Sequence, residues 1–404
     1  MKFINTLKDI FKIEELKNKI LLTIGLIAVY RFMAAVPLPG IDPLQLSALK
    51  ESTSGGLLGL LNAFTGGAFA RASVMALGIM PYISASIVVQ LMGIAVPYLQ
   101  KLQKDGESGR KKITQITRWL TIGITLVQAP TYITAIKTQF NLPPEAFLVS
   151  GITFWISSII ILTAGTIFAM WLGERITDKG IGNGISLLIT VGIIANFPAA
   201  FLQEFVSKTE NAGAGGLMMV LIEIIVWFVV ILLTVLLVTA VRKIAVQYAR
   251  RTVAGSTQNV AGSRDYIPLK LNAAGVMPII FAQAIMFLPL ALGQKFPILV
   301  GLTDPNGWQY NVIFALLIII FSYFYTAITI PTNKMAEDLK RSGGFIPGIR
   351  PGKDTADRLD SVLSRITFPG SLFLAGLSIL PAIVVQFGVQ QGWSMFYGGT
   401  SLII

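Results

Sequence analysis

The sequence predicts an all-α polytopic membrane protein. Of its 404 residues, 54% are hydrophobic and 13% are charged, and the mean hydropathy is +0.71. Soluble domains carry a charge on roughly a quarter of their residues, so the composition is not that of an ordinary soluble domain. Apolar runs close to the ~20 residues that cross a bilayer as a helix recur along the whole chain between polar segments.

The first 19 residues are polar, with apolar side chains at helical spacing. This pattern predicts a cytoplasmic amphipathic segment on the membrane surface, and no small-residue cleavage site follows it that would mark a signal peptide. Residues 20–36 are the first predicted spanning helix, which the motif Pro37-Leu-Pro-Gly40 ends.

A short apolar segment, residues 55–67, comes next and has a pair of glycines at each end. It is far shorter than the ~20 residues needed to cross a bilayer. Its glycine hinges are compatible with a mobile segment, and its length is equally compatible with a fixed re-entrant segment. The residues that give it this character are Gly55, Leu57, Leu58, Leu60, Leu61, Asn62, Phe64 and Gly67.

Eight further apolar runs are long enough to be spanning helices. They are residues 73–97, 119–136, 147–172, 185–201, 217–241, 273–292, 308–330 and 366–387. A tenth helix begins at residues 400–404, and five residues cannot span a bilayer, so we expect it to be truncated in this sequence.

Two of the predicted helices share a motif of Gly, an aliphatic residue, Met and Pro. The copies are Ala76-Leu-Gly-Ile-Met-Pro-Tyr-Ile-Ser-Ala-Ser86 and Ala274-Gly-Val-Met-Pro-Ile-Ile-Phe-Ala-Gln283. Because proline lacks a backbone N–H, we expect a kink in each helix. The two copies are either ordinary kinked membrane helices or the sign of an internal two-fold repeat, with halves at 20–201 and 202–404 and a working site between them.

Lysine and arginine predict the orientation in the membrane. Segments 1–19, 98–118, 173–184, 242–270 and 331–361 together hold 25 of the 32 basic residues. Basic loops remain on the cytoplasmic side, so we expect a multi-pass protein with a cytoplasmic N-terminus.

Two of these basic segments, 242–270 and 331–361, are too long to be simple connectors. Basic loops at a membrane are suited to docking an acidic protein, RNA or lipid head groups. They could also serve only to set orientation and to contact lipid. The basic residues that we consider for docking are Arg242, Lys243, Arg250, Arg251 and Arg350.

The chain lacks both Cys and His, which excludes disulfides, thiol nucleophiles, Cys/His zinc sites and histidine bases. The predicted spans are nearly free of ionisable residues, apart from Arg31 and Glu223, whereas ion-coupled transporters usually bury such residues. The segment Gly180-Ile-Gly-Asn-Gly-Ile185 has no strand before it and no Lys after it, so it is no phosphate loop; we expect a flexible entry to the next helix. We therefore expect no enzyme, no cofactor and no metal.

A pore without charges can be closed by a ring of apolar side chains that excludes water. Candidates are isoleucines one helical turn apart, Ile79 with Ile83 and Ile185 with Ile189, together with Ile280 in the second motif copy. On the residues alone, packing or lipid contact is the commoner role of such side chains.

Seven short motifs occur in order along the chain: Pro37-Leu-Pro-Gly-Ile-Asp42, the first motif copy at 76–86, Asp105-Gly-Glu-Ser-Gly-Arg110, Trp171-Leu-Gly-Glu174, Gly180-Ile-Gly-Asn-Gly-Ile-Ser186, Phe345-Ile-Pro-Gly-Ile-Arg-Pro-Gly352 and Gly398-Gly-Thr-Ser-Leu402. Together they resemble the SecY family, whose members are the central subunit of the bacterial protein-conducting channel.

The resemblance implies ten helices in two inverted halves, forming an hourglass-shaped channel in the bacterial plasma membrane. It places a pore ring at Ile79, Ile83, Ile185, Ile189, Ile280 and Ile404. Segment 55–67 would be a plug that seals this pore from outside. The substrates would be secretory and membrane protein precursors with signal sequences.

The resemblance also implies a lateral gate toward the membrane lipid, between the helices at 73–97 and 273–292. The polar residues that would hold it shut are Ser84, Gln90, Gln128 and Asn272. Hydrogen bonds between membrane helices contribute about 0.6 kcal/mol each, so an apolar signal helix could displace them. The expected partners are the SecE and SecG subunits, and the loops at Arg250 and Arg350 would dock the SecA motor ATPase or the ribosome.

Two other classes of protein are compatible with some of these features. A secondary transporter for small solutes also has inverted repeats and broken helices, but it would usually carry charges within the membrane. A lipid scramblase or insertion factor would need a lateral opening, but it would not need a ring of isoleucines.

Overall fold

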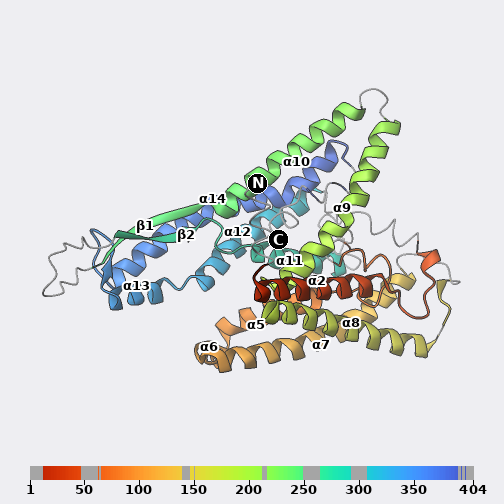
Figure 1. Cartoon of the computed structure of the whole chain (residues 1–404), viewed down its shortest axis with the longest axis horizontal. Coiled ribbons are helices and arrows are strands. Elements are labelled where there is room, and N and C mark those ends of the chain that lie inside the picture. The colour runs from red at the N-terminus through yellow and green to blue at the C-terminus, as the bar shows by residue number, and fades with distance from the viewer. Residues whose placement is uncertain are drawn as a thin grey trace. The chain divides into compact units, whose positions relative to one another are not determined.

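The computed structural model describes residues 12–46, 62, 65–138, 146–149, 151–211, 216–248, 264–292, 307–389, 393 and 396. These residues form two compact units (Figure 1). The N-terminal unit contains residues up to 207 together with Trp393, and the C-terminal unit contains residues 208–389 together with Phe396.

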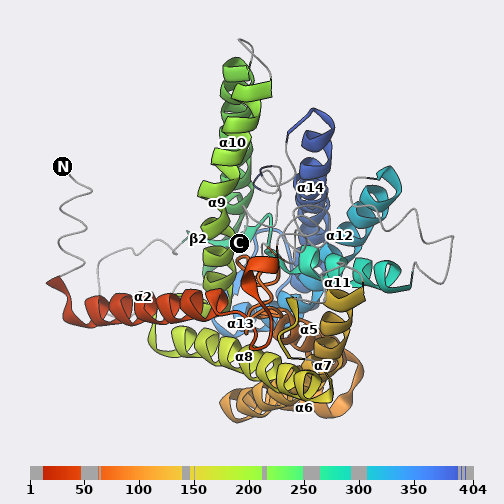
Figure 2. The same cartoon turned by 90° about the vertical axis from the view of Figure 1, so that its right-hand side faces the viewer.

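The N-terminal unit is built from helices that mostly match the predicted spans. They are α2 Glu14–Ala35, the short 3-10 helix η1 Pro43–Gln45, α5 Met80–Ala95, α6 Pro97–Lys104, α7 Gly106–Thr138, α8 Ile152–Lys179 and the main part of α9 Gly184–Asn211. Figures 1 and 2 show α7 and α8 packed side by side, and α5 also packs on α7.

The C-terminal unit contains four long helices and a small sheet. The elements are α10 Gly216–Thr239, β1 Val241–Tyr248, β2 Arg264–Lys270, α11 Met277–Leu292, α12 Trp308–Thr329, α13 Thr332–Arg341, β3 Gly344–Phe345 and α14 Lys353–Gln386. Helix α12 packs against both α11 and α14.

Within the described ranges, seven helical segments are long and apolar enough to cross a membrane. An eighth span is possible if α5 and α6, which meet at a bend of 101°, are counted as one broken helix. The protein is therefore an all-α polytopic membrane protein, as predicted. The predicted span at 273–292 corresponds to α11, which has only 16 helical residues.

The expected kink in the two Gly-x-Met-Pro helices was wrong. Each helix begins at the methionine of the motif, Met80 in α5 and Met277 in α11, so the proline lies in the first turn. There its missing N–H costs nothing, because the first N–H groups of a helix have no partner within it. The preceding glycine has positive φ in both copies, +52° at Gly78 and +62° at Gly275, and this left-handed residue directs the chain into the helix.

The helix predicted at 73–97 begins only at Met80, seven residues later than expected, because the left-handed Gly78 interrupts it. Residues 65–79 form consecutive turns instead, and Ala72 has a positive φ of +45° in addition to Gly78. Backbone hydrogen bonds tie this stretch to the chain that leaves α2: Leu38 N–H donates to Ala72 O at 2.8 Å, and Val74 N–H donates to Val36 O at 3.0 Å.

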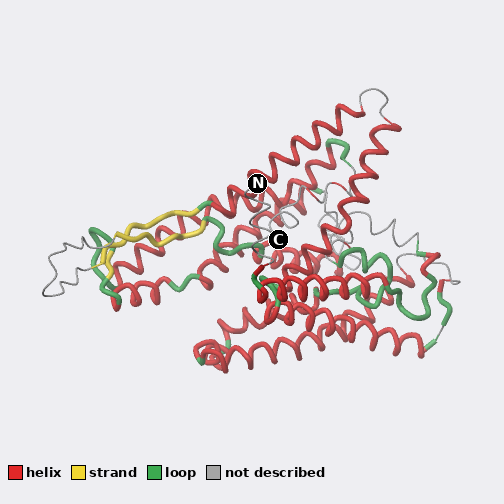
Figure 3. Tube along the Cα trace, viewed as in Figure 1, coloured by secondary structure: helices red, strands yellow, loops and turns green. Residues whose placement is uncertain are grey.

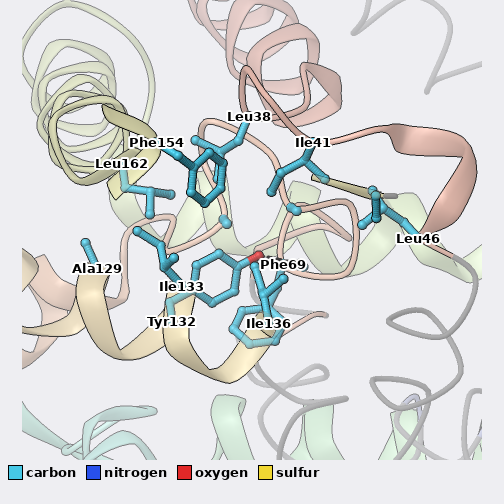
Figure 4. Packing of buried hydrophobic residues seen from close by; sticks show 13 residues of the cluster. Leu38, Ile41, Leu46, Phe69, Ala129, Tyr132, Ile133, Ile136, Phe154 and Leu162 are labelled. Atoms are coloured by element: carbon cyan, nitrogen blue, oxygen red, sulfur yellow. Dashed lines mark hydrogen bonds between the residues drawn. The ribbon is translucent and has the colours of Figure 1, made fainter. Parts of the chain in front are cut away.

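A hydrophobic core lies where this stretch meets α7 and α8 (Figure 4). Phe69 packs edge-on against Tyr132 of α7, with the ring centroids 4.9 Å apart, and the buried Tyr132 hydroxyl donates a hydrogen bond to Phe69 O at 2.8 Å. The remaining core residues come from the chain after α2, from the turns at 65–79, from α7, from the segment before α8 and from α8 itself. They are Leu38, Ile41, Leu46, Ala72, Ala76, Ala129, Ile133, Ile136, Ala146, Phe154 and Leu162. This core fixes the turns that lead into α5.

The basic segments 242–270 and 331–361 carry a sheet that the sequence analysis did not predict (Figure 3). Its three antiparallel strands have the order β2-β1-β3. Val246, Ile346 and Leu359 of α14 form its buried core. An alternation of apolar residues at Ile244, Val246 and Tyr248 is the sequence signal that could have predicted β1.

Candidate functional site

Two of the predicted ring isoleucines lie at the start of α5. Ile79 is the residue immediately before the helix and Ile83 lies one turn inside it, with Ile83 N–H donating to Ile79 O at 3.1 Å. Both side chains are buried, with exposed fractions of 4% and 8%. They lie in the N-terminal unit, where Ile79 is the last residue of the turns at 65–79.

The second predicted pair lies in the first two turns of α9, where Ile189 is buried and Ile185 is half-buried. Asn183 caps this helix, because its Oδ1 accepts hydrogen bonds from the N–H groups of Ile185 and Ser186. Thr177 of α8 accepts another from Gly184 N–H at 2.9 Å. Side-chain hydrogen bonds thus join the glycine-rich entry of α9 to α8 and to Asn183.

Glycines in this entry allow α8 and α9 to approach closely. A Cβ on Gly184 would overlap the carbonyl oxygen of Gly173 in α8, and a Cβ on Gly173 would lie 3.0 Å from the Ile185 side chain. Gly184 therefore accepts no larger residue without displacement of the backbone, whereas a larger residue at Gly173 would displace the Ile185 side chain. The approach sets the position of the predicted ring residue Ile185 against α8.

In the C-terminal unit, the predicted ring residue Ile280 lies in the first turn of α11 and is half-buried. It occupies the same place relative to the Gly-x-Met-Pro motif as Ile83 does in α5. Ile404 lies outside the described residues.

Of the predicted plug residues, the structure describes Asn62 and Gly67. The other six, Gly55, Leu57, Leu58, Leu60, Leu61 and Phe64, lie outside the described residues. Asn62 O accepts the N–H of Gly67 at 2.7 Å, and Asn62 Oδ1 accepts the N–H of Ala70 at 2.9 Å. These bonds close a compact turn at the C-terminal end of the segment.

This turn contacts the stretches that carry the predicted ring residues of the N-terminal unit. A Cβ on Gly66 would lie 3.0 Å from the Cα of Gly192, one turn beyond Ile189 on α9. A Cβ on Gly78, the residue before Ile79, would lie 3.0 Å from the Thr65 methyl group. The described end of the predicted plug therefore packs against both ring-bearing stretches of its own unit.

Two arginines donate hydrogen bonds to the backbone of the same turn. Arg31 of α2 donates to Gly66 O at 2.9 Å, and Arg71 donates to Gly66 O and to Gly67 O, both at 3.1 Å. In the sequence, Arg31 stands out only as an unusual charge in a predicted span, and Arg71 has no signal of this kind. Tyr132, which holds the next part of the stretch through Phe69 O, was also missed.

The second unusual charge, Glu223 of α10, forms an ion pair with Lys208 at 3.4 Å, and both side chains are about 12% exposed. Lys208 Nζ also donates to Gly388 O at 2.6 Å, just beyond α14. The carboxylate is therefore neutralised by a partner, as a charge in an apolar helix requires. This arrangement links α10 to the last residues of α9, which belong to the C-terminal unit, and to the end of α14.

The predicted gate residues lie on two helices and in the segment before a third. Ser84 and Gln90 are half-buried on α5, Gln128 is half-buried on α7, and Asn272 precedes α11 in the C-terminal unit. Gln90 Nε2 donates to Ser86 Oγ at 3.3 Å, within α5 itself. In the described part of the N-terminal unit, no hydrogen bond joins Ser84, Gln90 and Gln128 to one another.

The predicted docking residues that the structure describes are exposed on the C-terminal unit. Arg242 and Lys243 lie on β1, and Arg350 lies in the turn between β3 and α14. Thr355 Oγ1 donates to Arg350 O at 2.8 Å, which fastens this turn to the start of α14. Arg250 and Arg251 lie outside the described residues. Over the ranges that the structure covers, no cluster of acidic residues could hold a metal ion.

Comparison with known proteins decides the family. A family model described as SecY matches residues 73–404. The chain belongs to the SecY family. It is 38% identical to the protein translocase subunit SecY of Streptomyces scabiei, over 98% of this chain and 92% of that one. It is 40% identical to the subunit of the same name from Haemophilus influenzae, over 96% and 88% of the two chains.

Solved channel structures share the fold of this SecY family member. One, reported as the structure of a protein conducting channel, aligns with a TM-score of 0.63 at 20% identity over 95% of this chain and 88% of that one. Sec61 from a canine ribosome-channel complex of the endoplasmic reticulum aligns with a TM-score of 0.58 at 19% identity, with the same coverage.

Proposed function

We propose that this chain is the channel-forming subunit of a protein translocase. It passes unfolded secretory polypeptides across the bacterial plasma membrane and releases transmembrane segments sideways into the lipid. The observation that carries the proposal is the similarity over nearly the whole chain to proteins named protein translocase subunit SecY. The spanning helices, nearly free of charge, and the channel fold support the same function.

In this proposal the pore is closed by the ring of Ile79, Ile83, Ile185, Ile189, Ile280 and Ile404. Isoleucine suits a gasket around a moving chain, because its side chain excludes water and makes no hydrogen bonds to the substrate. The burial of three members in the N-terminal unit supports their role in a constriction.

Segment 55–67 is the plug of this channel, and the polar residues on α5, α7 and before α11 line its lateral gate. The contacts of Thr65 and Gly66 with the ring-bearing stretches support the plug assignment. A solved neighbour with a TM-score of 0.60 is titled for a plug domain that stabilises the closed state of SecY.

The partners are the SecE and SecG subunits, which complete the channel, and the SecA motor ATPase or the ribosome, which drives it. Exposed basic residues on the sheet and in the turn at Arg350 support docking on the cytoplasmic side. The N-terminus is also cytoplasmic in this arrangement, as the distribution of basic residues predicts.

A photo-crosslinker at Ile83, with a secretory chain stalled halfway through export, tests the proposal. We expect crosslinks from Ile83 to the stalled chain and none from Ile160, an isoleucine of α8 that is 61% exposed. The absence of crosslinks at Ile83, with the stalled chain engaged in the membrane, would refute the channel and favour a transporter or an insertion factor.

A further inference from the structure

The turn at Gly66 and Gly67 has an unusual backbone. Both residues have positive φ, +65° and +85°, a conformation that glycine adopts far more easily than other residues. A Cβ on Gly66 would overlap the Arg31 guanidinium, and one on Gly67 would lie 2.6 Å from Arg71 Nη2. Two successive glycines therefore form a tight bend whose free space is filled by arginine side chains.

Three hydrogen bonds from charged donors end on two carbonyl groups of this bend. Arg31 provides one from α2, 35 residues earlier in the chain, and Arg71 provides two that span both carbonyls. Both arginines are half-buried. Among the ion pairs of the described residues, none involves either of them, so the carbonyls are their acceptors there.

This arrangement couples the arginines to the position of the bend. Two cations that share one carbonyl oxygen repel each other, and a half-buried cation needs an acceptor. If the bend moved away, both guanidinium groups would remain half-buried, beside each other and without these acceptors. Hydrogen bonds from charged donors are also stronger than neutral ones. The arrangement therefore favours the position of the bend seen in the structure.

We infer that Arg31 and Arg71 are positioning residues that clamp the hinge of the plug in the closed channel. The inference rests on the proposed channel function and adds residues that keep the plug in place. The hinge contacts Gly192, one turn beyond Ile189, and Thr65 contacts Gly78 beside Ile79. A clamp at this point holds the base of the plug against the ring-bearing stretches. Movement of the bend away from α2 must break the bond from Arg31, and the two bonds from Arg71 hold the shape of the bend.

The two arginines differ in what can replace them. Arg31 makes a single bond to the hinge, which the ammonium group of a lysine can also make. Arg71 uses two nitrogens of one planar group for two carbonyls, and a lysine cannot reproduce this fork. Arg31→Lys should therefore preserve the clamp, whereas Arg71→Lys should weaken it although the charge remains.

Resting ion conductance of the full-length channel, reconstituted with its partner subunits in planar bilayers, tests the clamp. Loss of a hydrogen bond from a charged donor should shift the ratio of open to closed channels about tenfold. We expect this rise in Arg31→Ala, Arg71→Ala and Arg71→Lys. Arg31→Lys should behave like the wild type, as should Arg110→Ala, which removes an exposed charge from α7.

The three variants with raised conductance, Arg31→Ala, Arg71→Ala and Arg71→Lys, should also export a precursor with a defective signal sequence more readily. Their thermal unfolding midpoints should stay close to that of the wild type. A purely structural role would lower the midpoint and would not separate the two lysine variants. Arg71→Lys retains charge and bulk. If an alanine variant does not fold, the resting conductance of Arg71→Lys therefore tests the clamp.

Wild-type resting conductance in Arg71→Lys and both alanine variants, in channels that a signal peptide still opens, would overturn the clamp. If a signal peptide does not open even the wild-type channel, the proposed function fails and the clamp fails with it.

Discussion

Replacing Tyr132 with phenylalanine removes one hydroxyl group from the core of the N-terminal unit and leaves the ring in place. The hydroxyl donates to Phe69 O at 2.8 Å, in a site where the tyrosine is 4% exposed. The edge-on contact between the two rings needs no hydroxyl. The substitution therefore isolates a single hydrogen bond between α7 and the turns at 65–79.

The expected cost follows from what remains bonded to the Phe69 carbonyl. A buried acceptor left with no partner costs about 1–3 kcal/mol, whereas the net contribution of one hydrogen bond is about 0.5–1.5 kcal/mol. Ala72 N–H also donates to this carbonyl, at 3.2 Å, so the acceptor keeps one partner. We expect Tyr132→Phe to lower the free energy of unfolding by about 1 kcal/mol.

Reversible unfolding of the purified protein in mixed detergent micelles measures this change. Tyr82→Phe is the matched control, because the half-buried Tyr82 hydroxyl makes no hydrogen bond to any described residue, and it should change the free energy of unfolding by less than about 0.5 kcal/mol. Equal free energies of unfolding for the two variants would show that the hydrogen bond contributes nothing. A loss of ~3 kcal/mol in Tyr132→Phe would show instead that the Phe69 carbonyl is left without a partner.

Three further predictions concern packing, docking and the plug. Gly184→Ala should destabilise the protein by about 1–3 kcal/mol, because its Cβ would overlap Gly173 O. The control is Gly123→Ala on α7, where a Cβ meets nothing within 4 Å, and it should be neutral or slightly stabilising. Equal losses of stability in the two variants would contradict the close approach of α8 and α9. Arg350→Glu should slow motor-driven translocation several-fold in a reconstituted assay, with the thermal unfolding midpoint unchanged, and normal rates would exclude the docking role. Deletion of residues 55–67 should raise ion leak from reconstituted vesicles, and an unchanged leak would remove the plug assignment.

The sequence predicted most of the helices, because an apolar run of about 20 residues has few alternatives to a spanning helix. It did not predict where the Gly-x-Met-Pro helices begin. The same proline can kink a helix or open its first turn, and the choice depends on the left-handed conformation of Gly78 and Gly275. The sheet has a weak sequence signal, because the alternation at Ile244, Val246 and Tyr248 covers only three apolar positions within a basic segment.

The ring and gate assignments came from a resemblance of motifs, and composition alone would have favoured ordinary packing for the isoleucines. The docking residues came from the charge and length of the two basic segments. The hinge contacts of Arg31 and Arg71 had no sequence signal of their own. Their acceptors are backbone carbonyls, which every residue carries, and only the folded chain brings those of Gly66 and Gly67 within reach. Side chains that bond to a distant backbone are therefore hard to find from sequence.

The starting points of α5 and α11 have an electrostatic consequence. Helix α5 has 16 residues, about 24 Å at 1.5 Å per residue, which is less than the ~30 Å of a bilayer's hydrocarbon core. Its first turn carries the predicted ring residue Ile83, and the aligned peptide dipoles give this helix N-terminus roughly half a positive charge. Peptide dipoles do not titrate. A chain without histidine thus carries a fixed positive potential beside Ile79 and Ile83 that remains the same at every pH at which the helix is folded.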